Sequence, residues 1–256
     1  MNFKNFIKTS FLFITLVLVS CASKKDIIYL QNADSVKSSN EFSNYEPKLQ
    51  NDDLLSIIVS AEQPELTVPF NLPKIQGNYQ LDSNQENIKT YLIDTNGFIE
   101  FPVIGKIKLA GQTKTDAVKA LENKIREYIT NPAVNLRILN YKISVIGEVN
   151  KPGSYKISSE RITLLEALSQ AGDLTIYGKR NNLLVIREID SKMTYNRIDI
   201  TKADFINSDF YYLSQNDVIV VEPNKTKINS SVIGPNSSVI IATISLLITS
   251  LLILSR

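Results

Sequence analysis

The chain contains a single cysteine, Cys21, and this cysteine directly follows an apolar run near the start. Residues 1–8 carry two lysines and no acid, and residues 11–19 are apolar over about the length of a signal-peptide core, too short to span a bilayer. One cysteine excludes an intramolecular disulfide. If the protein is exported, its folded part must therefore be stabilised by its hydrophobic core without a disulfide.

The residues around Cys21 predict a lipid anchor. Residues 18–21 (LVSC) resemble a lipobox, in which an aliphatic residue and two smaller positions precede the acceptor cysteine. We expect a signal peptide over 1–20, lipid on Cys21 as the new N-terminus, and a polar tether over 21–45. Ala22 is compatible with sorting to the outer membrane. The alternatives are an ordinary signal with a chance cysteine just past the cleavage point, or a buried thiol.

The other end of the chain is also apolar. Residues 237–255 contain no charge, and nineteen residues at about 1.5 Å each reach roughly 28 Å, which predicts a transmembrane helix after a linker over 225–236. Small and hydroxyl side chains share one face of this helix, which suggests a face that meets other helices or a wet lumen. The alternative is that serine and threonine are simply tolerated in a lone anchor. The stripe consists of Ser238, Ala242, Ser245 and Thr249.

Charge and composition limit the function. Removing residues 1–20 removes Lys4 and Lys8, so 28 basic and 26 acidic groups become 26 of each, and a neutral body argues against a nucleic-acid partner. The chain has no histidine, and its cysteine is expected to be acylated. The usual general base, zinc ligand and nucleophile are thus missing. We expect no catalytic residues, no metal site, no cofactor and no enzymatic activity.

Residues 46–140 predict a first domain of strands with one amphipathic helix. Strands are expected at 54–59, 103–109 and 134–138, and residues 64–90 read as a long surface excursion. Asn96-Gly97 between two apolar runs predicts a hairpin turn. Thr113 resembles a helix cap, and Ala117, Leu121, Ile125 and Tyr128 recur at helical spacing.

Residues 141–224 predict a second domain. Strands are expected at 143–149 and 154–157 around the turn 150–153, then at 183–187, 197–200 and 218–221. Thr163, with Glu166 three residues later, caps a short helix over 164–171, and Gly172 follows where a left-handed residue belongs. Residues 49–55 (LQNDDLL) and 213–219 (LSQNDVI) echo each other, and both predict a polar turn that leads into a buried strand.

These segments, in this order, resemble the outer-membrane polysaccharide export family, the Wza-like auxiliary lipoproteins. The likeness covers nearly the whole chain, and its ordered set of motifs is more specific than any one of them. Residues 51–57 (NDDLLSI) are similar to the family's entry motif, and 94–105 (DTNGFIEFPVIG) to its hairpin. Residues 147–153 (GEVNKPG) and 165–174 resemble a soluble-ligand-binding β-grasp (SLBB) repeat. Longer members carry two or more such repeats, whereas this chain has one.

The resemblance implies an α+β fold, with an export domain, one β-grasp-like SLBB domain and a C-terminal transmembrane helix. It implies an outer-membrane lipoprotein whose soluble domains lie in the periplasm and whose copies form a ring. The ring would export capsular polysaccharide or exopolysaccharide supplied by an inner-membrane copolymerase of the tyrosine-kinase type. The alternatives are a doubly anchored, non-transporting scaffold or polysaccharide-binding accessory, and an envelope enzyme acting on glycans.

Several motif residues are expected to shape turns and to contact no ligand. They are Asn96, Gly97, Pro102, Gly105, Pro152 and Gly153. The tyrosines of the second domain have two interpretations: they stack on sugar rings, or they form part of the core and its rim. These tyrosines are Tyr155, Tyr177, Tyr211 and Tyr212.

Overall fold

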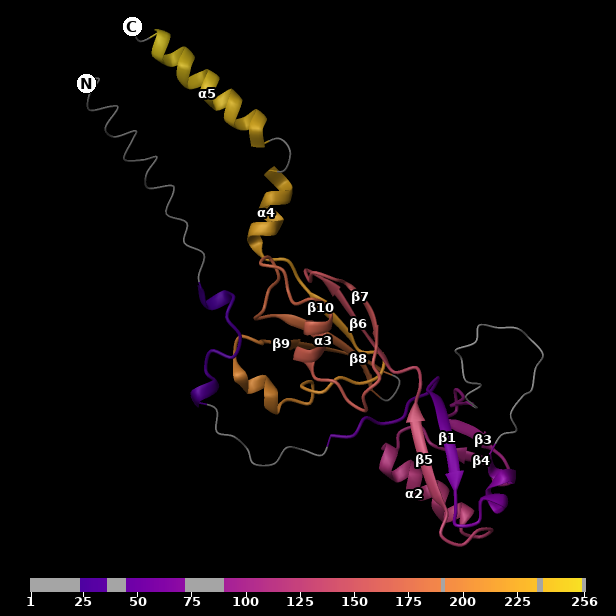
Figure 1. Cartoon of the computed structure of the whole chain (residues 1–256). Helices are drawn as coiled ribbons and strands as arrows, with labels where there is room; N and C mark the ends of the chain where they lie inside the picture. The colour runs from indigo at the N-terminus through magenta and orange to yellow at the C-terminus, as the bar shows by residue number, and fades with distance from the viewer. Residues whose placement is uncertain (1–23, 36–44, 72–89, 190–191, 234–236, 255–256) are drawn as a thin grey trace, which may run out of the picture.

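The structure, a computed structural model, describes residues 24–35, 45–71, 90–189, 192–233 and 237–254. Two domains follow each other along the chain, and two helices extend beyond the second domain (Figure 1). Each domain has its own cluster of buried apolar side chains. The described part of the chain is thus held by two hydrophobic cores, in a body that has no cysteine outside position 21.

The first domain is built on a three-stranded antiparallel sheet with the order β2-β1-β5. The strands are β1 (Leu54–Ser60), β2 (Tyr91–Leu92) and β5 (Ala133–Ile138). Helix α2 (Lys114–Ile125) packs next to β5. The predicted strands at 54–59 and 134–138 are confirmed.

Helix α2 begins as predicted at Thr113, whose side chain accepts a hydrogen bond from the Asp116 amide at 3.2 Å. Ala117, Leu121 and Ile125 are fully buried and hold the helix against the sheet. Tyr128, predicted as the fourth apolar position, lies beyond the end of the helix and is exposed. The apolar face of α2 is therefore one turn shorter than its spacing predicts.

The turn predicted at Asn96-Gly97 is present, closed by a hydrogen bond from the Gly97 amide to the Asp94 carbonyl at 2.9 Å, but it is not the expected two-residue type. A two-residue turn of the expected type needs positive φ at both residues, but only Gly97 has it, at +88°. The Asp94 carboxylate instead accepts hydrogen bonds from the amides of Asn96 (2.9 Å) and Phe98 (2.8 Å). A separate hairpin follows, in which β3 (Phe98–Phe101) pairs with β4 (Gly105–Lys108).

The start of the predicted surface excursion is ordered. Residues Pro64–Phe70 form a 3-10 helix, η3, in which Thr67 and Phe70 are buried. The Asn71 side chain then accepts from the Val59 amide and donates to the Val59 carbonyl, both at 3.0 Å. These bonds fix η3 to the end of β1. Residues 72–89 lie outside the described part of the chain.

The second domain has a five-stranded mixed sheet with the order β7-β6-β10-β8-β9, in which β10 and β6 are parallel and the other pairs are antiparallel. Helix α3 (Leu164–Gln170) buries Leu164, Ala167 and Leu168 in the core of the domain. The strands are β6 (Lys142–Gly147), β7 (Gly153–Lys156), β8 (Leu183–Ile189), β9 (Lys192–Ile198) and β10 (Val218–Val221). Strand β9 thus begins before the strand predicted at 197–200.

Local signals in the second domain predicted its helix correctly. Thr163 and Glu166 form a reciprocal capping box at the start of α3. Gly172 has a φ of +72° just after the helix. A short 3-10 helix, η4 (Ala203–Asn207), follows β9 and buries Ala203 and Phe205.

The N-terminal segment packs on the second domain rather than running free to the first. We call residues 24–35 the N-terminal strap; they include the 3-10 helices η1 (Lys24–Asp26) and η2 (Ala33–Ser35). The amides of Leu30 and Gln31 donate to the carbonyls of Ile200 (3.2 Å) and Thr201 (2.7 Å). Part of the segment expected to be a polar tether is therefore an integral piece of the second domain.

The C-terminal prediction requires a correction. Residues expected to form a linker contain helix α4 (Lys225–Ile233), and α5 (Ser237–Leu254) follows. Within the described residues, no helix is both long and apolar enough to cross a membrane, so the predicted transmembrane helix over 237–255 is wrong. The 18 residues of α5 rise only about 27 Å, short of a hydrocarbon core of about 30 Å.

Candidate functional site: the groove at the domain junction

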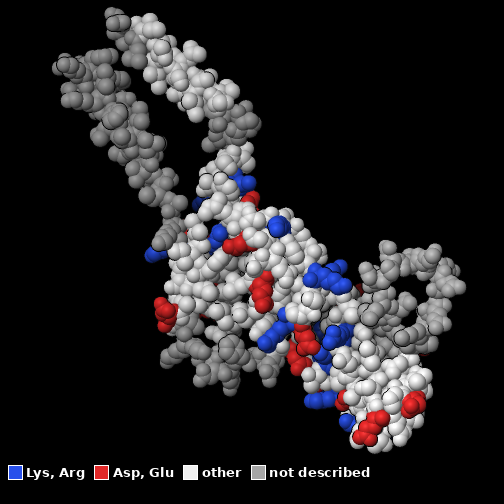
Figure 2. Space-filling model, in the orientation of Figure 1, with Lys and Arg blue, Asp and Glu red and all other residues white. Residues whose placement is uncertain are grey.

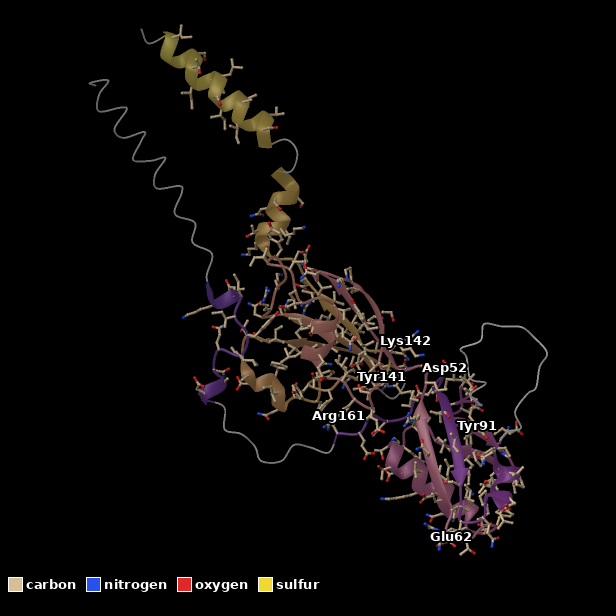
Figure 3. All side chains as sticks on the ribbon, in the orientation of Figure 1. Asp52, Glu62, Tyr91, Tyr141, Lys142 and Arg161 are labelled. Carbon is tan, nitrogen blue, oxygen red and sulfur yellow. The ribbon has the colours of Figure 1, made fainter. Side chains whose placement is uncertain are left out.

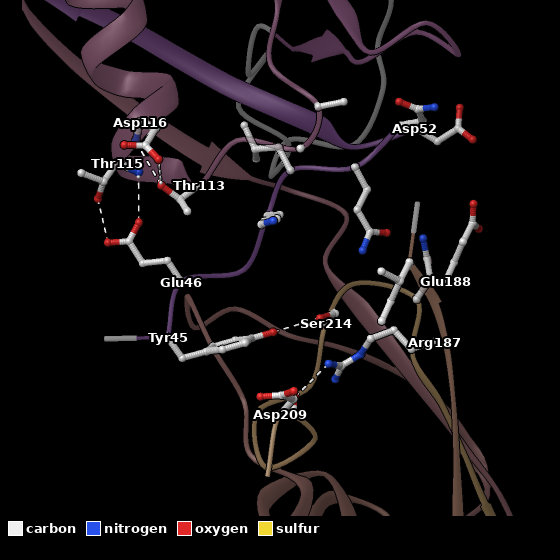
Figure 4. A pocket seen from close by; sticks show the side chains of 18 of the residues that line it. Tyr45, Glu46, Asp52, Thr113, Thr115, Asp116, Arg187, Glu188, Asp209 and Ser214 are labelled. Carbon is white, nitrogen blue, oxygen red and sulfur yellow. Dashed lines mark hydrogen bonds between the residues drawn. The ribbon is translucent and has the colours of Figure 1, made fainter. Parts of the chain in front are cut away.

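An open groove of about 1110 Å³ lies where the two domains meet (Figure 4). One wall comes from the first domain, mainly from residues 45–52 and the segment that leads into α2. The other wall comes from the end of β8 and from the turn before β10. The groove therefore exists only because both domains are held together.

The two echoed sequences form the same turn, and they lie on opposite walls. Asp52 and Asn216 both adopt a left-handed backbone, with φ of 65° and 64°. The next residue is an aspartate in each turn, Asp53 or Asp217, and both are buried. In each turn a carboxylate oxygen of this aspartate accepts a hydrogen bond from the amide three residues earlier, at 2.8 Å. The aspartate thus closes the turn that leads into the strand.

The two buried aspartates differ in their partners. Asp217 binds the guanidinium of Arg187, whose Nη2 lies 2.6 Å from Oδ2, and Arg187 itself is buried. Asp53 has no cation, and its buried Oδ1 has no hydrogen-bond partner among the described residues. Burial raises the pKa of Asp53 to about 6, and the neighbouring Asp52 carboxylate adds to this rise.

Asn140 joins the two turns from the short connection between the domains. Its side-chain amide donates to the Asp52 carbonyl at 2.8 Å and its side-chain oxygen accepts from the Leu54 amide at 2.9 Å. Its own carbonyl accepts from Gln215 Nε2 at 2.9 Å. Asp52, Tyr141 and Lys142 accordingly lie close to the junction in Figure 3, and Asn140 links the first turn to the second.

Aromatic and charged contacts close the junction at one end of the groove. The rings of Tyr45 and Tyr212 stack with their centroids 4.9 Å apart, and the Tyr45 hydroxyl lies 2.9 Å from Ser214 Oγ. Lys114 of α2 pairs with Glu160 of the second domain. The domains therefore contact each other through side chains other than Asn140 as well.

The tyrosines proposed to stack on sugars are engaged within the protein. Tyr212 stacks on Tyr45 and lies under the Arg161 guanidinium, 5.0 Å from the ring centre. Tyr211 is half-buried against the core, and the Tyr155 hydroxyl donates to the Lys151 carbonyl. The Tyr177 ring lies under the ammonium group of Lys227. These contacts favour the interpretation of the tyrosines as core and rim.

Six polar side chains of the groove make no hydrogen bond or ion pair within the described part of the chain. Three lie on each wall, and together they offer carboxylates, amides and one ammonium group. Such groups hydrogen-bond to hydroxyl-rich ligands, and no arrangement of nucleophile and base accompanies them. They are Lys48, Gln50, Asp52, Glu188, Asp209 and Asn216.

The residues named from the sequence lie elsewhere. Cys21 is outside the described residues. The stripe of Ser238, Ala242, Ser245 and Thr249 is exposed on α5, and the hydroxyls of Ser245 and Thr249 donate to the carbonyls of Ile241 (2.5 Å) and Ser245 (2.7 Å) of the same helix. None of this stripe reaches the groove.

The proposed turn residues lie in or beside the turns that flank β3, β4 and β7. Gly97 and Gly105 have positive φ, and Asn96 lies in the turn closed by Asp94. Pro102 lies between β3 and β4, and Pro152 and Gly153 precede or begin β7.

The sequence did not single out Asp53, Arg187, Asn140 or Asp217 as site residues. The repeated Asn-Asp followed by a buried strand was the signal that could have identified the two aspartates. Arg187 lies 30 residues before its partner Asp217 on another strand, so no local spacing predicts that pair. No group of three or more His, Cys, Asp or Glu residues within the described chain could hold a metal.

Comparison with known proteins agrees with this two-domain organisation. Residues 42–139 match the family described as polysaccharide biosynthesis/export protein, and residues 141–221 match the SLBB domain. The chain is 30% identical over 194 residues to the EPS I polysaccharide export outer membrane protein EpsA of Ralstonia solanacearum, which covers 72% of this chain and 51% of that protein. The protein of the same name from Ralstonia nicotianae is 34% identical over 141 residues, or 53% of this chain and 37% of the relative.

The chain is thus a pair of small α+β domains joined at a polar groove, an export domain followed by one SLBB domain. Its first domain belongs to the polysaccharide biosynthesis/export family, which is not a family of enzymes, and its second is an SLBB domain. The chain spans about half, or less, of the length of the relatives described above.

Proposed function

We propose that this chain is an outer-membrane lipoprotein that takes part in the export of exopolysaccharide across the outer membrane. Lipid on Cys21 would anchor it, and its two domains would lie in the periplasm. The observation that supports the proposal is the export domain followed by an SLBB domain, in a chain similar over 194 residues to a polysaccharide export outer membrane protein.

Export of a long polymer calls for several copies acting together. In this proposal the copies form a ring through head-to-tail contacts that close by rotation, and an inner-membrane copolymerase of the tyrosine-kinase type supplies the polymer. The small-residue stripe of α5 would face the α5 helices of neighbouring copies in the ring. Single-particle images of protein extracted in mild detergent test the ring, and monomers alone would contradict it.

The groove is the candidate surface for contact with the polymer. Its free carboxylate and amide groups match the hydroxyl groups of a glycan, and its open shape suits a chain that passes along it. Weak, exchangeable hydrogen bonds suit transport better than a deep pocket, because a polymer in transit must also be released. The groove would guide the chain without changing it chemically.

A deletion strain tests the main proposal. Loss of this protein should leave polysaccharide synthesis intact but retain the polymer inside the cell, measured as surface against cell-associated polysaccharide. Complementation with the wild-type gene should restore surface polymer. Unaltered export in the deletion strain would instead support a non-transporting scaffold.

A pair of variants tests the groove. Gln50→Ala with Glu188→Ala removes one free polar group from each wall, and we expect less surface polymer at an equal protein level. The control, Glu127→Ala with Asn135→Ala, changes two exposed residues of the first domain outside the groove. Equal export by both double variants would contradict a role for the groove.

A further inference from the structure

One end face of the second domain combines exposed isoleucines with lysines. It forms where the N-terminal strap and the start of α4 meet the loop 172–180, on the side of the second domain away from the first (Figure 1). Figure 2 shows Lys and Arg side chains at the base of α4. We call this surface the end face; its exposed apolar residues are Ile27, Ile28, Ile176, Tyr177 and Ile228.

The strap and α4 are fixed to the same loop. The Tyr29 hydroxyl donates to the Asp173 carboxylate at 2.5 Å, and the Arg180 guanidinium lies over the Tyr29 ring, 5.4 Å from its centre. The amide of Asn224, just before α4, donates to the Tyr177 carbonyl at 2.7 Å. The end face is therefore one rigid surface built from three parts of the chain.

Charge on this face favours an anionic partner. Lys25 and Lys225 are exposed and have no carboxylate within ion-pair distance among the described residues. Lys227 lies 3.7 Å from Glu148, so one basic group is balanced locally. Exposed isoleucines beside unpaired lysines fit a lipid surface, where apolar side chains enter the headgroup region and ammonium groups meet phosphates.

The position of the lipid-bearing cysteine brings this face to the membrane. Lys24, the first described residue, lies three residues after Cys21, and three residues span at most about 11 Å. The strap is bonded to the second domain from Tyr29 onward. A lipid on Cys21 therefore holds the second domain, rather than the first, close to the membrane. We propose that the end face is a membrane-contact surface that binds anionic lipid headgroups, and that it places the second domain against the lipid with the first domain projecting away. This rests on the proposed lipidation of Cys21.

The absence of tryptophan from the chain allows a direct test. Ile176→Trp puts a single indole on the end face, where Ile176 is 57% exposed, and Val68→Trp puts one at a 67% exposed site on η3 of the first domain. Each full-length, lipidated protein is reconstituted into vesicles of phosphatidylglycerol and brominated phosphatidylcholine. We expect quenching of the indole at position 176 and none at position 68. No quenching at 176, or equal quenching at both sites, overturns the proposal.

Charge variants test the role of the lysines on the Ile176→Trp background. Lys25→Gln and Lys225→Gln should each lower, by about fivefold, the ratio of protein whose end face contacts the membrane to protein whose end face does not, as reported by quenching of the indole. The control, Lys119→Gln with Lys124→Gln on α2, should leave quenching unchanged. Unchanged quenching in the Lys25→Gln, Lys225→Gln double variant overturns the assignment to anionic lipid.

The test separates this inference from the proposed function. Mass spectrometry of the purified protein reports the lipid on Cys21. If the lipid is missing, the lipoprotein proposal fails, and quenching with added vesicles still decides whether the end face binds lipid. If export is lost in the deletion strain but position 176 is not quenched, the function stands and the end-face inference fails.

Discussion

At the scale of single residues, the two echoed turns place the same carboxylate in two different electrostatic environments. Asp217 is compensated by Arg187, whereas Asp53 is buried with one oxygen unpartnered among the described residues. A buried carboxylate without a cation is more stable when protonated. Burial raises the pKa of both aspartates, but the Arg187 guanidinium opposes the rise at Asp217, whereas no cation opposes it at Asp53.

Asp53→Asn should change how stability depends on pH. Burial raises the pKa of Asp53 from 3.8 to about 6, so the folded state binds this proton more tightly than the unfolded state. The stability that this tighter proton binding contributes is fully present below the unfolded pKa and is lost as the pH rises through about 6. A pKa difference of about two units corresponds to about 3 kcal/mol. Relative to wild type, the free energy of unfolding of the asparagine variant should thus improve by about 2 kcal/mol between pH 4 and pH 7.5.

Denaturant titrations at the two pH values measure this difference. Asp34→Asn, at an exposed position of the strap, is the control and should show no comparable trend. A difference between Asp53→Asn and wild type that stays constant with pH would show that Asp53 is ionised in the folded protein.

Asp217→Asn should instead lower the free energy of unfolding strongly at neutral pH. It leaves the buried Arg187 guanidinium without its counter-ion, which costs about 3–5 kcal/mol. The double variant Arg187→Met, Asp217→Asn removes both charges and should recover part of the loss. Thermal unfolding of the three proteins measures this, and a double variant less stable than Asp217→Asn would contradict the assigned imbalance of charge.

At the scale of elements, the second sheet depends on close contact between the end of β6 and β10. Gly147 has a φ of +94°, and a Cβ there would lie 2.1 Å from the Val221 carbonyl oxygen. That carbonyl accepts the Glu148 amide at 2.9 Å, so it cannot move away without losing a bond. Glycine is required at this position by both backbone conformation and space.

Gly147→Ala should therefore destabilise the second domain by about 2–5 kcal/mol, from backbone strain and overpacking combined. Gly153→Ala, in β7, is the matched control, because a Cβ at that position would meet nothing within 4 Å and the φ of Gly153 is not positive. Chemical denaturation followed by circular dichroism compares the two. Equal destabilisation would show that the contact with Val221 relaxes at low cost.

Elements with strong local signals could be predicted, and elements defined by distant partners could not. The capping residues Thr163 and Glu166 and the apolar spacing in α2 were enough to predict both helices. The Asn96-Gly97 signal predicted the turn but not its type, because Asp94 accepts the amides of Asn96 and Phe98 and only Gly97 is left-handed. The strap reads as polar tether because its hydrogen bonds go to Ile200 and Thr201, far along the chain.

At the scale of the whole molecule, the groove depends on the angle between the domains, and Asn140 is bonded to both of its walls. Its side chain holds the first turn through Asp52 and Leu54, and its carbonyl holds the second through Gln215. The two halves of the candidate site are visible in the sequence as a pair of similar segments. How they meet depends on contacts between distant residues, such as those of Asn140 and the Tyr45–Tyr212 stack, which no local pattern predicts.

Asn140→Ala should loosen the junction without unfolding either core. It leaves the Leu54 amide and the Asp52 carbonyl without their partners, at a cost of about 1–3 kcal/mol. Spin labels on cysteines introduced at Glu127 and Lys192, one on each domain, report the distance between domains by pulsed electron resonance. In lipidated protein Cys21 is blocked, so only these two sites take the label. We expect a broader distance distribution in Asn140→Ala than in wild type.

The control for the junction is Asn135→Ala, an exposed residue of β5 that leaves the three bonds of Asn140 in place. Its distance distribution should match that of wild type. The Tyr45–Tyr212 stack and the Lys114–Glu160 pair also cross the junction, so the domains should stay associated in Asn140→Ala and only the spread of angles should grow. An unchanged width would mean that these contacts alone fix the angle, and that the groove keeps its shape without Asn140.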